Sequence, residues 1–266
     1  MYSLKDILNN LAIRAREARS KWSDEYVDST ISEFRIVCPK CHDRKFLRHN
    51  VPRGHELYGV YYPCGDCWTS DDSTCARDQI SHRSGIEDYP DMTFANWSGR
   101  RHGDVEEAMS KMWDWLNGER FVGRHTVLIH GPPGTGKTHL AAAAVRWWLA
   151  QDRNAHIFTV NQLLNLANEK ILDDQGYYLW LRDIRETGLL VLDDLGQQRH
   201  TDFRDEVLKD IIHHRYQLKE PTIITTNLPP RDLEQTLHPA TASRLLDASE
   251  SLRIPLEVPS YRKERR

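Results

Sequence analysis

The pattern of apolar and polar positions over residues 91–266 predicts a parallel α/β domain. Short apolar runs, which suit strands buried on both faces, alternate there with amphipathic stretches of helical period. Three such runs are Thr126–His130, 189–192 and Thr222–Thr226, and a helix is expected over about 139–148. Strands that alternate with helices in this way form a parallel sheet covered by helices.

Residues 1–35 have a different pattern, which predicts one amphipathic helix. Ser3 and Asp6 have the spacing of a helix-capping pair. Apolar side chains then recur in steps of four and three and form one narrow stripe: Leu4, Leu8, Leu11, Ala15, Ala18 and Trp22. Such a helix either packs on its own domain or docks into a groove of another protein, and the pattern leaves both open.

Composition adds that the chain is globular. It has 266 residues, of which 39% are hydrophobic and 28% charged, too apolar for a disordered protein. No apolar run approaches the roughly 18 residues that a membrane-spanning helix needs. Lys5 and Asp6 stand where a signal peptide would be apolar. We therefore expect a soluble, cytoplasmic protein with no membrane partner.

Five cysteines fall in one segment, residues 36–90, and predict a small zinc-binding domain. Four of them form two pairs with two residues between the members, which is the ligand spacing of a tetrahedral zinc site, and the intervening residues suit a hairpin. A redox role is the main alternative, His42 or His55 could replace a ligand, and Cys75 is left over. The expected Zn²⁺ ligands are Cys38, Cys41, Cys64 and Cys67.

The first apolar run leads into a phosphate-binding loop (P-loop) of the pattern GxxxxGK[ST], between a strand and a helix. Its glycines let backbone amides wrap a phosphate, and the helix N-terminus adds its positive end. Lys137 would reach the β- and γ-phosphates of ATP, and the Thr138 hydroxyl would join the Mg²⁺ shell. The loop residues are Gly131, Pro132, Pro133, Gly134, Thr135, Gly136, Lys137 and Thr138.

The second and third apolar runs each end in polar residues that suit the same site. Asp193 and Asp194 follow the second run. We expect Asp193 to hold Mg²⁺ through water, and Asp194 to orient or deprotonate the water that attacks the γ-phosphate. Asn227 follows the third run and can hold that water.

Taken in order along the chain, these motifs resemble an AAA+ ATPase. After the P-loop and the double acid come Thr225, Thr226 and Asn227, then residues 243–245 around an arginine, and finally residues 260–262. More narrowly, the chain resembles the DnaC/DnaI-type replicative helicase loaders and their IstB-like relatives. Three segments resemble the zinc-containing branch of that family: the cysteine pairs, the residues Ser84, Gly85 and Ile86, and the residues Met92, Thr93 and Phe94.

The resemblance implies roles for further residues. Arg244 falls where the family places its arginine finger, Arg262 where it places a second sensor arginine, and His139 is counted with the nucleotide-binding residues. Asn227, Lys137 and Asp194 would act in hydrolysis as described above. Most family members have Asp-Glu where this chain has Asp193 and Asp194. Because Asp is one methylene shorter, we expect slow hydrolysis, stimulated by DNA or a partner.

The net charge is −3, so DNA contact must come from local patches. The basic tail 261–266 is one candidate, and the zinc ribbon is another. Residues 197–204 are a third, because they combine cations with Phe203, although Phe203 could instead pack inward.

Three regions are thus expected: a helical segment 1–35, a zinc-binding domain 36–90 and an AAA+ domain 91–266. The leading interpretation is an ATP-dependent loader that self-associates with ATP and grips a hexameric replicative helicase through its N-terminal module. It would place that helicase on single-stranded DNA. The alternatives are an IstB-like transposition ATPase on duplex DNA, or a zinc-dependent nucleic-acid-binding module with a regulatory ATP site. A small-molecule P-loop kinase is poorly supported, because no acceptor site is evident.

Overall fold

The fold is seen in a computed structural model of the chain. It describes residues 46–48, 61–63, 84–97, 103–118, 123–151, 153–171, 174–199 and 201–261.

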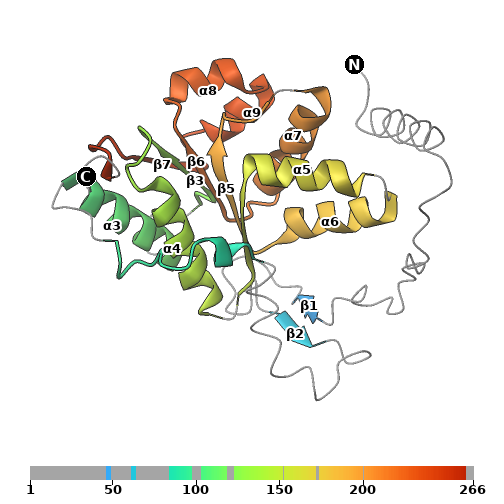
Figure 1. Cartoon of the computed structure of the whole chain (residues 1–266), viewed down its shortest axis with the longest axis horizontal. Helices are drawn as coiled ribbons and strands as arrows, with labels where there is room; N and C mark the ends of the chain where they lie inside the picture. Colours follow the sequence, from blue (N-terminus) through green and yellow to red (C-terminus); the bar gives the residue numbers. More distant parts are fainter. Residues whose placement is uncertain are drawn as a thin grey trace, which may run out of the picture.

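Five parallel strands form the centre of the described part (Figure 1). Their order in the sheet is β4-β5-β6-β3-β7. Because the strands are parallel and β5, β6 and β3 are neighbours, the carboxyl ends of these three strands lie side by side at one edge of the sheet. The strands are β3 (Thr126–His130), β4 (Ala155–Thr159), β5 (Leu189–Leu195), β6 (Thr222–Thr226) and β7 (Ser251–Pro255).

Helices cover both faces of this sheet (Figure 1). One face is covered by η2 (Ile86–Asp88), α3 (Gly103–Asn117) and α4 (Lys137–Leu149). The other face is covered by α5 (Val160–Lys170), α6 (Asp174–Glu186) and α7 (Asp202–Gln217), and α8 (Pro230–Thr236) and α9 (Pro239–Leu245) add to the same core, with α9 packed against α7.

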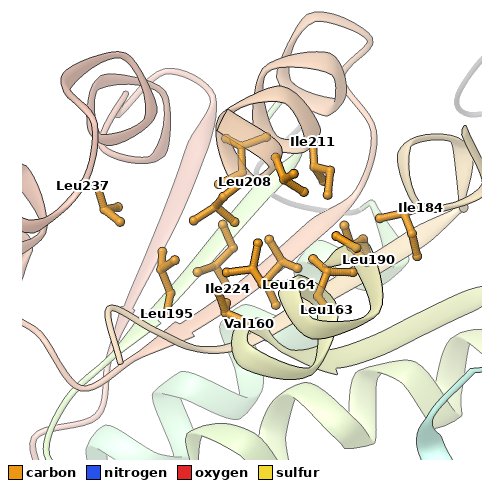
Figure 2. Packing of buried hydrophobic residues seen from close by; sticks show 14 of the residues in the cluster. Val160, Leu163, Leu164, Ile184, Leu190, Leu195, Leu208, Ile211, Ile224 and Leu237 are labelled. Atoms are coloured by element: carbon orange, nitrogen blue, oxygen red, sulfur yellow. The ribbon is translucent and has the colours of Figure 1, made fainter. Parts of the chain in front are cut away.

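Alternate residues of each strand enter opposite cores, which is why the strands are continuously apolar in sequence. In β5, Leu189 and Val191 pack on the α4 side, whereas Leu190 and Leu192 pack on the α5 side, and all four are 0% exposed. Figure 2 shows Leu190 beside Leu163 of α5, which belongs to the same core cluster. Burying one such side chain stabilises the fold by about 2 kcal/mol.

The predicted strands β3 and β6 are confirmed at both ends. Two other boundaries differ from expectation. β5 continues through Asp193 and Asp194 to Leu195, and α4 begins at Lys137 rather than His139. The earlier helix start follows from Gly136, which caps α4 with a φ of 99° and so turns the P-loop directly into the helix.

Upstream, the two arms of the expected hairpin pair with each other. β1 (Phe46–Arg48) runs antiparallel to β2 (Tyr61–Pro63), with Phe46 opposite Pro63. The four expected zinc ligands and the N-terminal stripe lie outside the described residues, so both stay predictions. Within the described residues, no helix is long and apolar enough to cross a membrane, and no group of three or more His, Cys, Asp or Glu could hold a metal ion.

Candidate nucleotide site

The P-loop follows β3 and is held closely by the end of the chain. A Cβ atom on Gly131 would lie 2.2 Å from the carbonyl oxygen of Leu256, and one on Gly134 would lie 2.2 Å from Ser260 Oγ. The backbone N–H of Tyr261 donates to the Gly134 carbonyl at 2.9 Å. The segment 256–261 is therefore a strap across the loop, and glycine is required where the two approach.

Lys137 lies inside this loop and is only 5% exposed. Its Nζ donates to the carbonyl oxygens of Gly131 at 2.8 Å and Pro132 at 2.7 Å. The Thr135 hydroxyl donates to the same Pro132 carbonyl at 3.0 Å. The ammonium is thus held among the backbone groups of the loop, at the N-terminal end of α4, where a phosphate would bind.

The two residues expected to serve Mg²⁺ are in direct contact. The Thr138 hydroxyl donates to Asp193 Oδ1 and Oδ2 at 3.0 and 3.1 Å, although the two residues are 55 positions apart. On the other side, the Thr225 hydroxyl donates to Asp193 Oδ1 at 2.6 Å. A hydroxyl and a carboxylate side by side are the oxygen ligands that Mg²⁺ prefers, so this donor set fits the ion.

Burial raises the pKa of Asp193, which is 2% exposed. The negative charge of Asp194 raises this pKa further, whereas the hydroxyl hydrogen bonds and the positive charge of Lys137 lower it. A cation beside the carboxylate would act in the same direction as Lys137.

The structure also brings Asp194 and Asn227 together. Asn227 Nδ2 donates to Asp194 Oδ1 at 3.3 Å, across 33 positions of sequence. Asp194 has a φ of 57°, in the left-handed region, and the pairing of β5 with β6 shifts register between Leu192 and Leu195. The double acid therefore sits on a β-bulge, which changes the direction of the Asp194 side chain.

The segment 84–97 forms a wall of the site that the sequence did not single out for chemistry. Trp97 lies against the P-loop, with Cη2 only 3.0 Å from the position of a Cβ atom on Gly136. Burial, followed by the charges of Asp193, Asp88 and Asp194, raises the pKa of Tyr89 to about 12. Nothing in the local sequence of Tyr89 or Trp97 signals these positions, because long-range packing on α4 creates them.

His139 contacts this wall. One ring nitrogen, Nε2, lies 2.8 Å from the Thr93 carbonyl oxygen, and the ring meets that of Trp97 edge to face at 5.2 Å. His139 therefore anchors the 84–97 segment to α4, and a direct contact of His139 with nucleotide stays a prediction.

The remaining predicted residues either make no contact with this cluster that the structure records or lie outside the described residues. Arg244 is on α9, partly exposed, and donates from Nη1 to the Ala240 carbonyl of its own helix at 2.6 Å. Arg262 lies outside the described residues. Phe203 is 6% exposed and packs in the core between α7 and the sheet. Of the two alternatives for Phe203, the structure shows the inward packing, because the ring is buried at the first turn of α7 and is not available to stack on DNA.

Comparisons with known proteins agree with this geometry. A family model described as IstB-like ATP binding protein matches residues 102–266. The replicative helicase loader DnaC of Escherichia coli K12 is 27% identical over 184 residues, which cover 68% of this chain and 74% of DnaC. The protein YdaV of the same organism is 31% identical over 152 residues, 57% of this chain and 60% of YdaV.

An ATP-binding protein in an insertion sequence of Mycobacterium tuberculosis is 30% identical over 145 residues, 53% of this chain and 57% of that protein. Among solved structures, the DnaC helicase loader has a TM-score of 0.52 at 25% identity and covers 60% of this chain and 94% of that one. DnaI has a TM-score of 0.55 at 22% identity and covers 64% and 93%. These likenesses confirm the AAA+ P-loop fold of the described sheet and helices.

Proposed function

Because this chain belongs to the family of IstB-like ATP-binding proteins, we propose that it is an ATP-dependent loader of a replicative helicase. The observation that carries the proposal is the assembled site, in which Thr138 meets Asp193 and Asp194 meets Asn227. The match to DnaC, which extends over 68% of this chain, favours a loader.

The site suits ATP hydrolysis with each side chain in a separate role. Lys137 and the amides at the start of α4 would hold the phosphates, and Thr138 and Asp193 would hold Mg²⁺. When bound, Mg²⁺ neutralises charge on the β- and γ-phosphates. Asp194 would orient or deprotonate the attacking water, and Asn227 would hold that water or the Asp194 carboxylate in place.

Two arginines would complete the site. Arg244 lies on α9 and donates to a carbonyl of its own helix, and we assign it to the site of a neighbouring subunit in an ATP-dependent oligomer, where it would act as an arginine finger. Arg262 directly follows the strap over the P-loop, and we assign it to the nucleotide of its own subunit.

The N-terminal region would bind the helicase. The stripe containing Leu8 and Leu11 would dock on the partner, and the ribbon held by Cys38, Cys41, Cys64 and Cys67 with Zn²⁺ would support it. Single-stranded DNA would lie along the ATPase domains, and the basic residues after Tyr261 are candidates for that contact.

The decisive experiment measures binding of the full chain to fluorescent single-stranded and duplex DNA, with and without ATP, and loading of the host replicative helicase onto single-stranded circles. A loader should prefer single-stranded DNA and should raise the amount of helicase on the circles only with ATP. Lys137→Ala is the matched control and should fail in the loading step.

A second candidate is favoured by the insertion-sequence relative, which is 30% identical. In that case the chain would be a transposition ATPase. ATP-dependent coating of duplex DNA, with no recruitment of the helicase, would support this second function and would rule out the loader.

A further inference from the structure

The hydroxyl of Thr225 joins the two acidic residues of the nucleotide site. Thr225 is 0% exposed, and its Oγ1 donates to Asp193 Oδ1 at 2.6 Å. The same Oγ1 accepts the backbone N–H of Asp194 at 3.0 Å. An amide N–H can only donate, so the hydroxyl accepts there and directs its one proton to the Asp193 carboxylate. Both hydrogen bonds therefore have a fixed direction.

The bulge in β5 explains why the Asp194 amide needs this acceptor. The register of β5 against β6 shifts between Leu192 and Leu195, which takes Asp194 out of the regular ladder. A buried amide without a partner is costly, and the Thr225 side chain replaces the missing carbonyl. One residue further on, the Thr226 hydroxyl donates to the Leu195 carbonyl at 2.7 Å. Two neighbouring threonines of β6 thus close the bulge, but only Thr225 contacts a carboxylate.

We propose that Thr225 is a positioning residue for ATP hydrolysis. It holds the Asp193 carboxylate against the Thr138 hydroxyl, so that both oxygens face one Mg²⁺. It also fixes the backbone of Asp194 in the left-handed conformation that directs this side chain to Asn227. The inference rests on the proposed function, in which Asp193 serves the metal and Asp194 the attacking water.

The test compares Thr225→Val, which removes the hydroxyl at nearly constant volume, with Thr225→Ser, which keeps it. Thr226→Val is the matched control, because it removes a hydroxyl that donates to the Leu195 carbonyl and accepts the Leu228 N–H, and that contacts neither carboxylate. For each variant of the full chain we would measure the Mg²⁺ concentration for half-maximal ATPase activity, kcat, nucleotide affinity with and without Mg²⁺, hydrogen exchange of the Asp194 amide, and Tm.

Thr225→Val should raise the half-maximal Mg²⁺ concentration and lower kcat, each about tenfold, because a hydrogen bond to a charged group is lost. Nucleotide affinity without Mg²⁺ should stay within about twofold, since the P-loop contacts are unchanged. The Asp194 amide should exchange faster. Thr225→Ser should restore the wild-type values, and Thr226→Val should lower Tm without changing the Mg²⁺ requirement.

Two results would overturn the inference. One is an unchanged Mg²⁺ requirement and kcat in Thr225→Val, and the other is an equal change in Thr225→Val and Thr226→Val, which would indicate only structural support. If the wild-type chain hydrolyses no ATP under any condition, the proposed function fails instead. Thr225 is then judged by Mg²⁺-dependent nucleotide affinity and Asp194 exchange, and wild-type values of both in Thr225→Val overturn its positioning role.

Discussion

Lys137 and Asp194 reach the nucleotide site from different elements, and their contacts indicate different functions. The Lys137 ammonium lies within the P-loop, bonded to the carbonyls of Gly131 and Pro132. The Asp194 carboxylate lies on the β5 bulge and meets Asn227. The first position suits contact with bound phosphates, and the second suits contact with the attacking water. Substitution of the two residues should therefore separate binding from hydrolysis.

We expect Asp194→Asn to bind ATP almost normally and to lose hydrolysis by about 10²-fold or more, because a general base contributes on that order. Lys137→Ala should instead weaken ATP affinity, by about tenfold, as a charged hydrogen-bonding group is lost. Titration with a fluorescent nucleotide and steady-state ATPase assays measure the two effects. Equal loss of ATP affinity in both variants would contradict this division.

At the scale of elements, one buried arginine ties α6, α7 and β6 together. Arg215 of α7 is 1% exposed. Its Nε donates to Thr222 Oγ1 at 2.9 Å, and its Nη atoms donate to the carbonyls of Arg185 and Thr187 at 2.8 Å and of Pro221 at 2.6 Å. The guanidinium thus satisfies carbonyl groups at the end of α6 and at the start of β6. Its contribution is to stability, and it lies away from the P-loop.

We expect Arg215→Met to lower the free energy of unfolding by about 3 kcal/mol or more, because several buried carbonyl groups lose their donor. The exposed Arg231→Met on α8 is the matched control and should change the free energy by less than about 0.5 kcal/mol. Urea unfolding followed by circular dichroism measures both. A small effect at Arg215 would mean that water replaces the guanidinium.

The strap over the P-loop gives a second prediction at this scale. Tyr261→Pro removes the N–H that donates to the Gly134 carbonyl at 2.9 Å, whereas Tyr261→Ala keeps it. We expect Tyr261→Pro to bind ATP about fivefold more weakly, the effect of one backbone hydrogen bond, and Tyr261→Ala to bind normally. Equal weakening in both variants would show that the tyrosine side chain, and not the strap backbone, supports the loop.

The elements also show how far the sequence alone could lead. β3 and β6 were predictable because continuous apolar runs specify buried parallel strands, and the P-loop because its spacing is specific to a strand followed by a helix. The β5 bulge was not predictable. It depends on the pairing of Asp194 with Thr225, which is 31 positions away, and no local pattern encodes that register. For Phe203 the sequence left stacking on DNA and packing in the core both open, because an aromatic ring at the start of a helix suits either, and only the structure shows that the ring is buried.

At the scale of the whole molecule, the family match over residues 102–266 confirms the expectation of an AAA+ ATPase. The described chain brings together the P-loop, Asp193, Asp194 and Asn227 at one edge of its sheet. Arg244 is the exception, since it donates to Ala240 of its own helix α9. In the role proposed above, Arg244 would act as an arginine finger on the site of another subunit. Hydrolysis would then depend on assembly.

Complementation between two inactive variants tests this dependence. Lys137→Ala has a defective P-loop and an intact Arg244, and Arg244→Ala has the reverse. We expect Arg244→Ala alone to bind ATP almost normally and to lose hydrolysis by about 10³-fold, the lower range for an arginine finger. Mixed at equal concentration, the two variants should regain part of the ATPase activity, because the finger of one subunit completes the P-loop site of its neighbour.

The measurement is ATP turnover over a range of mixing ratios, with co-assembly checked by size-exclusion chromatography. Recovery should be greatest near equal amounts, where mixed interfaces are most frequent. If the variants co-assemble and no ratio restores activity, Arg244 does not act between subunits, and its role is confined to its own chain.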